Sequence, residues 1–143
     1  MADGQACLDS LKACYAEWDR SKGGSVDTWL RIFADEVDFR SLADGHAGIP
    51  WTASRRTKEA VRRYLEELNA MFRMDHYTVD RFICQDDTIV MIGSTAWTHR
   101  TTGKQASSPK VDVWRFDSNG KAIGFFELYD TANVIAAATP DAR

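Results

Sequence analysis

Two acidic residues, Asp112 and Glu127, lie in segments that otherwise have the composition of buried strands. An Asn-Gly pair between the segments predicts a tight turn with positive φ, and hence a β-hairpin. Alternate residues of a strand share a face, so Asp112 points the same way as Trp114. Glu127 likewise shares its face with Phe125 and Tyr129. A carboxylate among aromatic rings is exposed, paired with a cation, or held in a pocket, where it can act as a general acid or base.

The other residues that could do acid–base or metal chemistry are three histidines and three cysteines. His76 lies in a strand-like segment, His99 beside a turn, and His46 in a loop containing Gly and Pro. Their spacing is not that of metal ligands. The cysteines, odd in number and without a Cys-x-x-Cys pair, are Cys7, Cys14 and Cys84. We therefore expect free thiols in a reducing cytoplasm, no metal site and no organic cofactor.

The composition limits the class of protein. The 143 residues suffice for one domain, and 44% hydrophobic with 27% charged residues is ordinary for a globular chain. The net charge of −3 gives no general attraction to nucleic acid or to an anionic membrane. No segment is apolar for long enough to be a signal peptide or a membrane span. We expect neither nucleic acid nor membrane as a partner.

The elements that must position these side chains follow from periodicity. Apolar residues recur at helical spacing over residues 5–22, in a short segment after Ser25, and again after Thr57. From about residue 74 the period changes to two, and the segments expected as strands are 75–84, 88–100, 106–116 and 121–132. A short strand is also expected at 37–42. Helices followed by an antiparallel meander predict an α+β fold in which the helices cover one face of a curved sheet.

Three stretches resemble the nuclear transport factor 2-like superfamily, which includes ketosteroid isomerase and the SnoaL-like polyketide cyclases. These stretches are "FADEVDF", "VDVWRFDSNGK" and "FELYDTAN". The resemblance implies one ketosteroid isomerase-like (cystatin-like) domain over residues 1–143, with its core at about 8–135. Its curved antiparallel sheet would pack on three N-terminal helices as a cone around one pocket. Because the superfamily performs several chemistries and some members only bind, the fold alone does not choose the function.

The resemblance to ketosteroid isomerase assigns roles to two residues. In that enzyme a tyrosine of the first helix and a protonated aspartic acid donate hydrogen bonds to an enolate oxygen. Tyr15 and Asp112 occupy the matching places. The proton-moving carboxylate of the isomerase falls near Ser41, which cannot act as that base. The resemblance therefore implies Tyr15 and a protonated Asp112 as oxyanion donors, with a base from elsewhere.

Three other groups of the superfamily give Glu127 and His76 a role. Limonene-epoxide hydrolase and the cyclases carry an essential Asp seven residues after the hairpin glycine, and Glu127 stands at that place. Gly93 and Thr95 replace the hydrolase's Arg and second Asp, so its triad is incomplete. Scytalone dehydratase has a catalytic histidine at the place of His76 and a second near His99.

We therefore expect an isomerase-like enzyme that transfers a proton on a small apolar molecule bearing a carbonyl or hydroxyl group. Glu127 would be the general base, and His76 a second proton carrier. The expected substrate-binding residues are Trp18, Phe39, Ser41, Trp51, Trp97, His99, Trp114, Phe125 and Tyr129.

Other interpretations of the same residues stay open. A cofactor-free dehydratase, cyclase or hydrolase would use the same groups. A ligand-binding or assembly module without catalysis would result if Asp112 only bonds a buried Tyr15, and Glu127 only pairs with an arginine.

Strand alternation also predicts an apolar outer face on the sheet. The residues that point away from the pocket include Val90, Ile92, Val111, Val113, Phe126 and Leu128. Such a patch is larger than a soluble monomer usually exposes, so we expect a homodimer that associates through this face. The alternative is that the C-terminal "VIAAATPDAR" folds back over it.

Overall fold

The fold combines helices with one sheet, as the sequence predicts. The computed structural model describes residues 3–142. Its elements are α1 (Gly4–Arg20), α2 (Val26–Ile32), β1 (Phe33–Ser41), the 3₁₀ turn η1 (Pro50–Thr52), β2 (Arg55–Thr57), α3 (Lys58–Met71), β3 (Phe72–Gln85), β4 (Thr88–His99), β5 (Gln105–Phe116), β6 (Ala122–Leu128) and α4 (Thr131–Ala138). None of the helices within 3–142 is long and apolar enough to cross a membrane.

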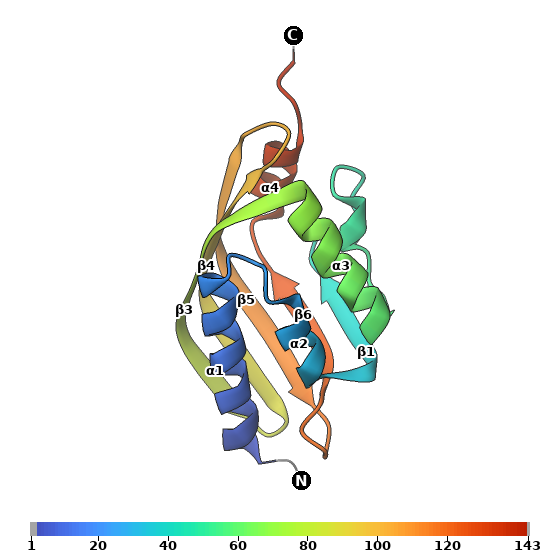
Figure 1. The fold of residues 1–143 in the computed structure, drawn as a ribbon, viewed down its shortest axis with the longest axis vertical. Coiled ribbons are helices and arrows are strands. Elements are labelled where there is room, and N and C mark those ends of the chain that lie inside the picture. Colours follow the sequence, from blue (N-terminus) through green and yellow to red (C-terminus); the bar gives the residue numbers. More distant parts are fainter. Residues whose placement is uncertain (1–2, 143) are drawn as a thin grey trace.

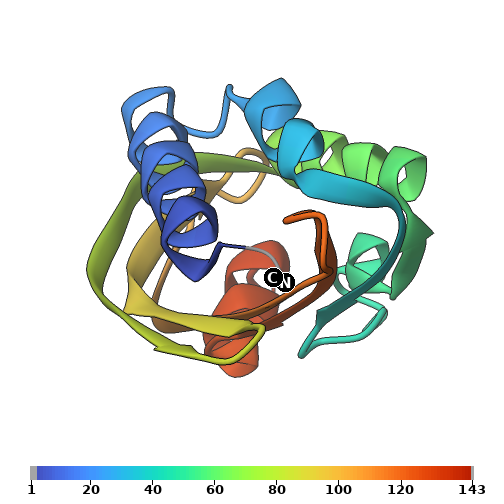
Figure 2. The same cartoon turned by 90° about the horizontal axis from the view of Figure 1, so that it is seen from below.

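The sheet has six strands in the order β2-β1-β6-β5-β4-β3. It curls around an interior that α1, α2 and α3 close from the other side (Figures 1 and 2). The pairs are antiparallel except β1 and β6, which run parallel, so the expectation of a purely antiparallel sheet was wrong at this pair. The long connection between these two strands, through α3 and four other strands, leaves either direction open.

The helices form where capping and periodicity place them. Asp3 caps α1 by accepting the N–H of Gln5 (2.9 Å), and Thr57 caps α3 by accepting the N–H of Ala60 (3.1 Å). The buried faces consist of Cys7, Leu11, Cys14, Tyr15 and Trp18 on α1, and of Val61, Tyr64 and Leu65 on α3. These two faces cover the concave side of the sheet and bring one tyrosine each into the interior.

The C-terminal segment differs from the prediction. The last strand ends at Leu128 instead of continuing to 132, and a helix follows it. Asp130 starts this helix by accepting the N–H of Asn133 (3.0 Å), which is a standard N-cap. Val134 of α4 lines the central cavity, so the helix contributes to the interior.

Two irregularities in β3 decide which side chains face inward. The register shifts between Met74 and His76 and again between Val79 and Arg81. The first shift turns Tyr77 inward, where Asp19 of α1 accepts its backbone N–H (2.9 Å). Such bulges re-aim side chains without leaving an obvious trace in the sequence.

The outer face of the sheet carries the predicted apolar residues. Val90, Ile92, Val111, Val113, Phe126 and Leu128 are all partly exposed. We predict that the protein is a homodimer through this face, with sedimentation equilibrium giving twice the 16.1 kDa monomer mass at micromolar concentration. A Val113→Lys variant should be monomeric, because it places a charge in the patch. A wild-type species at the monomer mass would rule the dimer out.

Candidate functional site

A central cavity lies between the helices and the concave face of the sheet. It has a volume of about 100 Å³, and its walls are mostly aromatic. All but three of the residues predicted for the site line it: Tyr15, Trp18, Phe39, Trp51, Trp97, Asp112, Trp114, Phe125, Glu127 and Tyr129.

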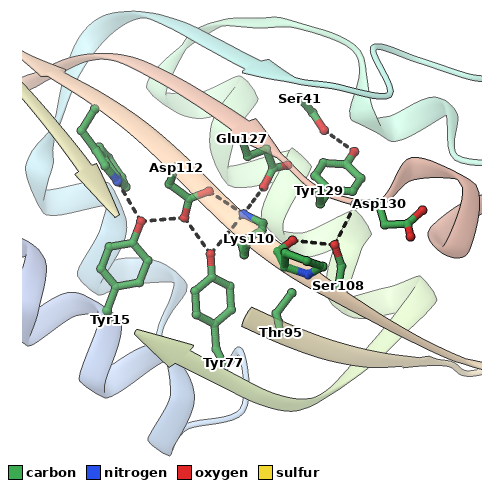
Figure 3. A network of polar contacts seen from close by, with 12 residues as sticks. Tyr15, Ser41, Tyr77, Thr95, Ser108, Lys110, Asp112, Glu127, Tyr129 and Asp130 are labelled. Carbon is green, nitrogen blue, oxygen red and sulfur yellow. Dashed lines mark hydrogen bonds and ion pairs between the residues drawn. The ribbon is translucent and has the colours of Figure 1, made fainter. Parts of the chain in front are cut away.

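The polar part of the cavity is built around Lys110 of β5 (Figure 3). Its ammonium nitrogen donates to Asp112 Oδ1 (2.5 Å), to Glu127 Oε2 (2.9 Å) and to the Tyr77 hydroxyl (3.1 Å). The side chains of Lys110, Asp112 and Glu127 are only 8%, 2% and 14% exposed. An ammonium group has three protons, so every donor of Lys110 is used within the protein.

The direction of each hydrogen bond fixes the state of Asp112. The indole N–H of Trp114 donates to the Tyr15 hydroxyl (2.8 Å), as Lys110 does to the Tyr77 hydroxyl. Each phenol therefore gives its own proton to Asp112 Oδ2, at 2.6 Å from Tyr15 and 2.7 Å from Tyr77. Asp112 accepts in all its bonds and is a carboxylate. The expectation of a protonated Asp112 that donates was wrong, because Lys110 and two tyrosines supply the protons.

Glu127 stands directly across the β5–β6 pair from Asp112. Its Oε1 accepts the Tyr64 hydroxyl proton, while its Oε2 accepts from Lys110. The cation that pairs with Glu127 is thus a lysine of the adjacent strand, where the sequence suggested an arginine. Glu127 is the most exposed of the three charged groups, so it is the one that a small molecule in the cavity can reach.

The three charged groups leave the cavity with a net charge of −1, since one ammonium faces two carboxylates. Burial alone would lower the pKa of Lys110, but the charges of Asp112 and Glu127 raise it above its usual value. Lys110 therefore stays protonated and cannot act as an amine nucleophile.

Three predicted residues do not line the cavity. His76 is exposed on the outer surface, where its Nδ1 lies 3.1 Å from Thr78 Oγ1, because the bulge at Met74 turns it outward. His99 is buried, but its Nδ1 accepts backbone N–H groups of the following turn. Ser41 lies behind Tyr129 and bonds to its hydroxyl. The expected site is therefore corrected at three places: His76 is not placed to carry a proton in the cavity, and Ser41 and His99 do not line it as substrate-binding residues.

The places matched to the hydrolase triad cannot supply it. A Cβ added at Gly93 would lie 2.0 Å from the carbonyl oxygen of Thr78, so no side chain fits there. The Thr95 hydroxyl donates to the carbonyl oxygen of His76 (2.9 Å) and is committed to the backbone.

Sequence reasoning missed the residues that hold the acids in place, namely Tyr64, Tyr77 and Lys110. For Lys110 a signal existed, because it lies two residues before Asp112 and strand alternation puts both on one face. Tyr64 lies on the apolar stripe of α3, but nothing local distinguishes a core tyrosine from a functional one. Among residues 3–142, no group of His, Cys, Asp and Glu side chains could hold a metal ion.

All four tyrosines of the chain belong to this site. Burial, and then the negative charges of Asp112 or Glu127, raise the pKa values of Tyr15, Tyr64 and Tyr77 well above 10.0. The same causes raise the pKa of Tyr129 to about 12.

We predict that the native protein shows no tyrosinate absorbance at pH 10, whereas the chain unfolded in guanidinium titrates near its usual value of about 10. Because the folded state keeps protons that the unfolded state loses, this contribution to stability is complete below about pH 10. This contribution is lost as the pH rises toward the pKa values of the tyrosines in the folded protein. The prediction would be wrong if tyrosinate formed near pH 10 while the far-ultraviolet circular dichroism stayed native.

Comparison with known proteins agrees with this architecture. The family model described as a SnoaL-like domain matches residues 11–125. No curated protein gives a match. An NTF2-like protein from Burkholderia pseudomallei K96243 is 24% identical, with a TM-score of 0.78 over 93% of this chain and 97% of that one.

Two more distant structures share the fold. A candidate isomerase from Rhodopseudomonas palustris is 16% identical, with a TM-score of 0.72 over 96% of this chain and 98% of that one. A protein from Catenulispora acidiphila with a ketosteroid isomerase-like fold, in complex with trimethylamine, is 14% identical, with a TM-score of 0.73 over 92% and 93%. At these identities the likeness establishes the fold and leaves the chemistry to the site.

Proposed function

The chain belongs to the SnoaL-like domain family of the nuclear transport factor 2-like superfamily, and from this premise we propose that it is a cofactor-free enzyme that transfers a proton. Its substrate would be a small, largely apolar molecule with a carbonyl or hydroxyl group. One observation carries the proposal: Glu127 is held between Lys110 and Tyr64 in an aromatic cavity, as the most exposed charged group there. A fixed carboxylate next to a fixed cation is what proton abstraction beside a carbonyl requires.

The proposed step conserves the charge of the site. Glu127 takes a proton from the carbon next to the carbonyl, and the electrons of the broken C–H bond form an enolate. The site carries −1 before the step, on Glu127, and −1 after it, on the substrate oxygen. Once Glu127 is neutral, the Lys110 proton that bonded it can turn to the enolate. Return of the proton to another carbon completes an isomerisation.

Asp112 has a positioning role in this proposal. It holds Lys110 by an ion pair (2.5 Å) and is itself held by the hydroxyls of Tyr15 and Tyr77. The groups expected to touch the substrate oxygen, Tyr15 and Asp112, thus act through Lys110 instead. Preorganised charge of this kind lowers the cost of forming an oxyanion in a dry site.

Size and charge limit the substrate. The cavity of about 100 Å³ is smaller than an engineered site of about 150 Å³ that takes benzene. The reacting part of the substrate is therefore no larger than a single small ring. A carboxylate or phosphate is disfavoured because the site already has an excess negative charge and all donors of Lys110 are occupied.

Deuterium exchange tests the proposal without knowledge of the natural substrate. Small ketones, such as cyclopentanone and an unsaturated cyclic ketone, are incubated with the protein in D₂O and followed by proton NMR. We expect protein-dependent deuteration beside the carbonyl in the wild type, and none above buffer with Glu127→Gln. Equal exchange with both proteins, or none with either, would contradict the proposal.

A binding role without catalysis is the second candidate. Its support is the combination of a net negative charge, fully used Lys110 donors and aromatic walls, which suits a small organic ammonium ion. The trimethylamine complex of the Catenulispora acidiphila protein gives this ligand class a precedent in the same fold. Saturable quenching of tryptophan fluorescence by tetramethylammonium, together with no deuterium exchange, would favour this candidate.

A further inference from the structure

The carbonyl oxygen of a substrate needs a hydrogen-bond donor as soon as it enters the cavity. It leaves the hydrogen bonds of water behind, and an unpaired polar atom in a dry site is costly. Lys110 cannot be this donor before the proton moves, because its protons go to Asp112, Glu127 and Tyr77. The donor must therefore be another group in the cavity wall.

The hydroxyl groups that line the cavity differ in what accepts their protons. Within residues 3–142, all but one donate to a carboxylate or to a backbone carbonyl oxygen. These are the hydroxyls of Tyr15 and Tyr77 (to Asp112), Tyr64 (to Glu127), Thr95 (to the carbonyl oxygen of His76) and Ser108 (to that of Pro109). The exception is Tyr129, whose hydroxyl bonds the Ser41 hydroxyl.

The bond between Tyr129 and Ser41 can run in either direction, because each hydroxyl has one proton and can also accept. When Ser41 donates, the Tyr129 proton is available to a ligand. This change needs the rotation of two O–H bonds and no movement of heavier atoms. At the other three tyrosines, a ligand would have to replace a carboxylate, which is a much stronger acceptor than a hydroxyl.

Tyr129 also lies next to the proposed base. It follows Glu127 by two positions, and both side chains line the cavity (Figure 3). Burial, and then the charge of Glu127, raise the pKa of Tyr129 to about 12, while the charge of Lys110 acts in the opposite direction. The hydroxyl is therefore within electrostatic reach of both charged groups. Tyr129 is partly exposed, whereas the other tyrosines are buried.

We propose that Tyr129 donates the hydrogen bond that holds the carbonyl oxygen of the substrate. This inference rests on the proton transfer by Glu127 proposed above and adds the group that receives the substrate oxygen. Ser41 donates to the Tyr129 oxygen and so makes the Tyr129 O–H a better donor. The bond to the substrate strengthens as the enolate forms, and Tyr129 keeps its own proton throughout. Lys110 joins as a second donor once Glu127 is neutral.

Binding of cyclopentanone labelled with carbon-13 at its carbonyl tests this role. The titration is made in H₂O, where exchange of protons by Glu127 leaves the ketone unchanged, and methylenecyclopentane is the matched probe without the oxygen. We expect a downfield shift of the bound carbonyl carbon with the wild type, because a hydrogen bond withdraws electrons from the carbonyl. Tyr129→Phe should lose this shift and bind cyclopentanone roughly 3–10-fold more weakly, the value of one hydrogen bond. It should bind methylenecyclopentane as the wild type does.

Ser41→Ala separates donation to the ligand from a structural role of the pair. It leaves the Tyr129 proton without a competing acceptor, so this variant should bind cyclopentanone at least as tightly as the wild type. Equal weakening by both substitutions would overturn the proposal. So would a carbonyl shift that persists in Tyr129→Phe, since an indole N–H of the wall would then be the donor. If Tyr129→Phe does not fold, the double variant Tyr129→Phe/Ser41→Ala replaces it, because it leaves neither hydroxyl unpaired.

Deuterium exchange distinguishes a failure of this inference from a failure of the proposed proton transfer. In D₂O, Tyr129→Phe should exchange the protons of cyclopentanone about 10²-fold more slowly than the wild type, the usual cost of one oxyanion donor. A wild type that shows the carbonyl shift but no exchange would refute the base and keep Tyr129 as the donor to the ligand. A wild type that exchanges protons but shows no carbonyl shift would refute Tyr129 alone.

Discussion

Replacing Lys110 with methionine is expected to lower the free energy of unfolding by about 3–5 kcal/mol, the range for removing one partner of a buried ion pair. The variant keeps a side chain of similar length, so little packing is lost. What remains are two carboxylates, Asp112 and Glu127, that face each other across β5 and β6 without a cation. Each is almost fully removed from water, and their repulsion adds to the cost of burial.

Urea denaturation at pH 7 measures this effect. The pKa of Lys110 is raised in the folded state. The contribution of its ion pairs to the free energy of unfolding is therefore complete below the usual lysine pKa of about 10.4 and is lost only at higher pH. A measurement at neutral pH therefore includes the full contribution of these ion pairs to stability.

The matched control is the double variant Lys110→Met/Glu127→Gln. It removes the second carboxylate and leaves Asp112 with the hydroxyls of Tyr15 and Tyr77. We expect it to recover about 1–3 kcal/mol relative to Lys110→Met, the usual coupling for groups in one network. If the free energy of unfolding of Lys110→Met lay within about 1 kcal/mol of the wild-type value, the ion pairs of Lys110 would not hold the site together.

Strand alternation was the sequence feature that predicted most of the site. It placed Asp112 and Glu127 on one face with Trp114 and Phe125, and in the structure all four line the cavity. The same rule includes Lys110, but a lysine next to a proline in a strand is usually exposed. It is buried here because Glu127, 17 positions later in the chain, faces it across the sheet. Composition and local period carry no information on such a pair.

The incorrect part of the predicted site traces to backbone irregularities. His76 was placed inward by resemblance, whereas a bulge between Met74 and His76 turns it out and Tyr77 in. A bulge is set by the path of the neighbouring strand, and this one lies opposite Trp97 and Ala96 of β4. The parallel pairing of β1 with β6 likewise depends on the long route between them. Neither feature has a local signature.

Replacing Glu127 with glutamine is expected to lower the rate of the proposed proton transfer by about 10²–10⁴-fold, the usual contribution of a general base. The rate is measured by deuterium exchange, with any ketone that the wild type labels. Glutamine has the same shape, so its carbonyl oxygen can still accept from Lys110 while its amide donates to the Tyr64 oxygen.

The fold should survive this change, which distinguishes Glu127 from Lys110. Glu127→Gln brings the net charge of the cavity from −1 to zero, so we expect its free energy of unfolding to stay within about 1 kcal/mol of the wild type. Glu127→Asp keeps a base on a shorter side chain and should retain part of the rate, because proton transfer depends on reach as well as on charge. If Glu127→Gln exchanged protons as fast as the wild type, another group would be the base. We thus expect Lys110→Met to lose stability and Glu127→Gln to lose only the exchange rate. This difference arises only if Lys110 holds the site together while Glu127 moves the proton.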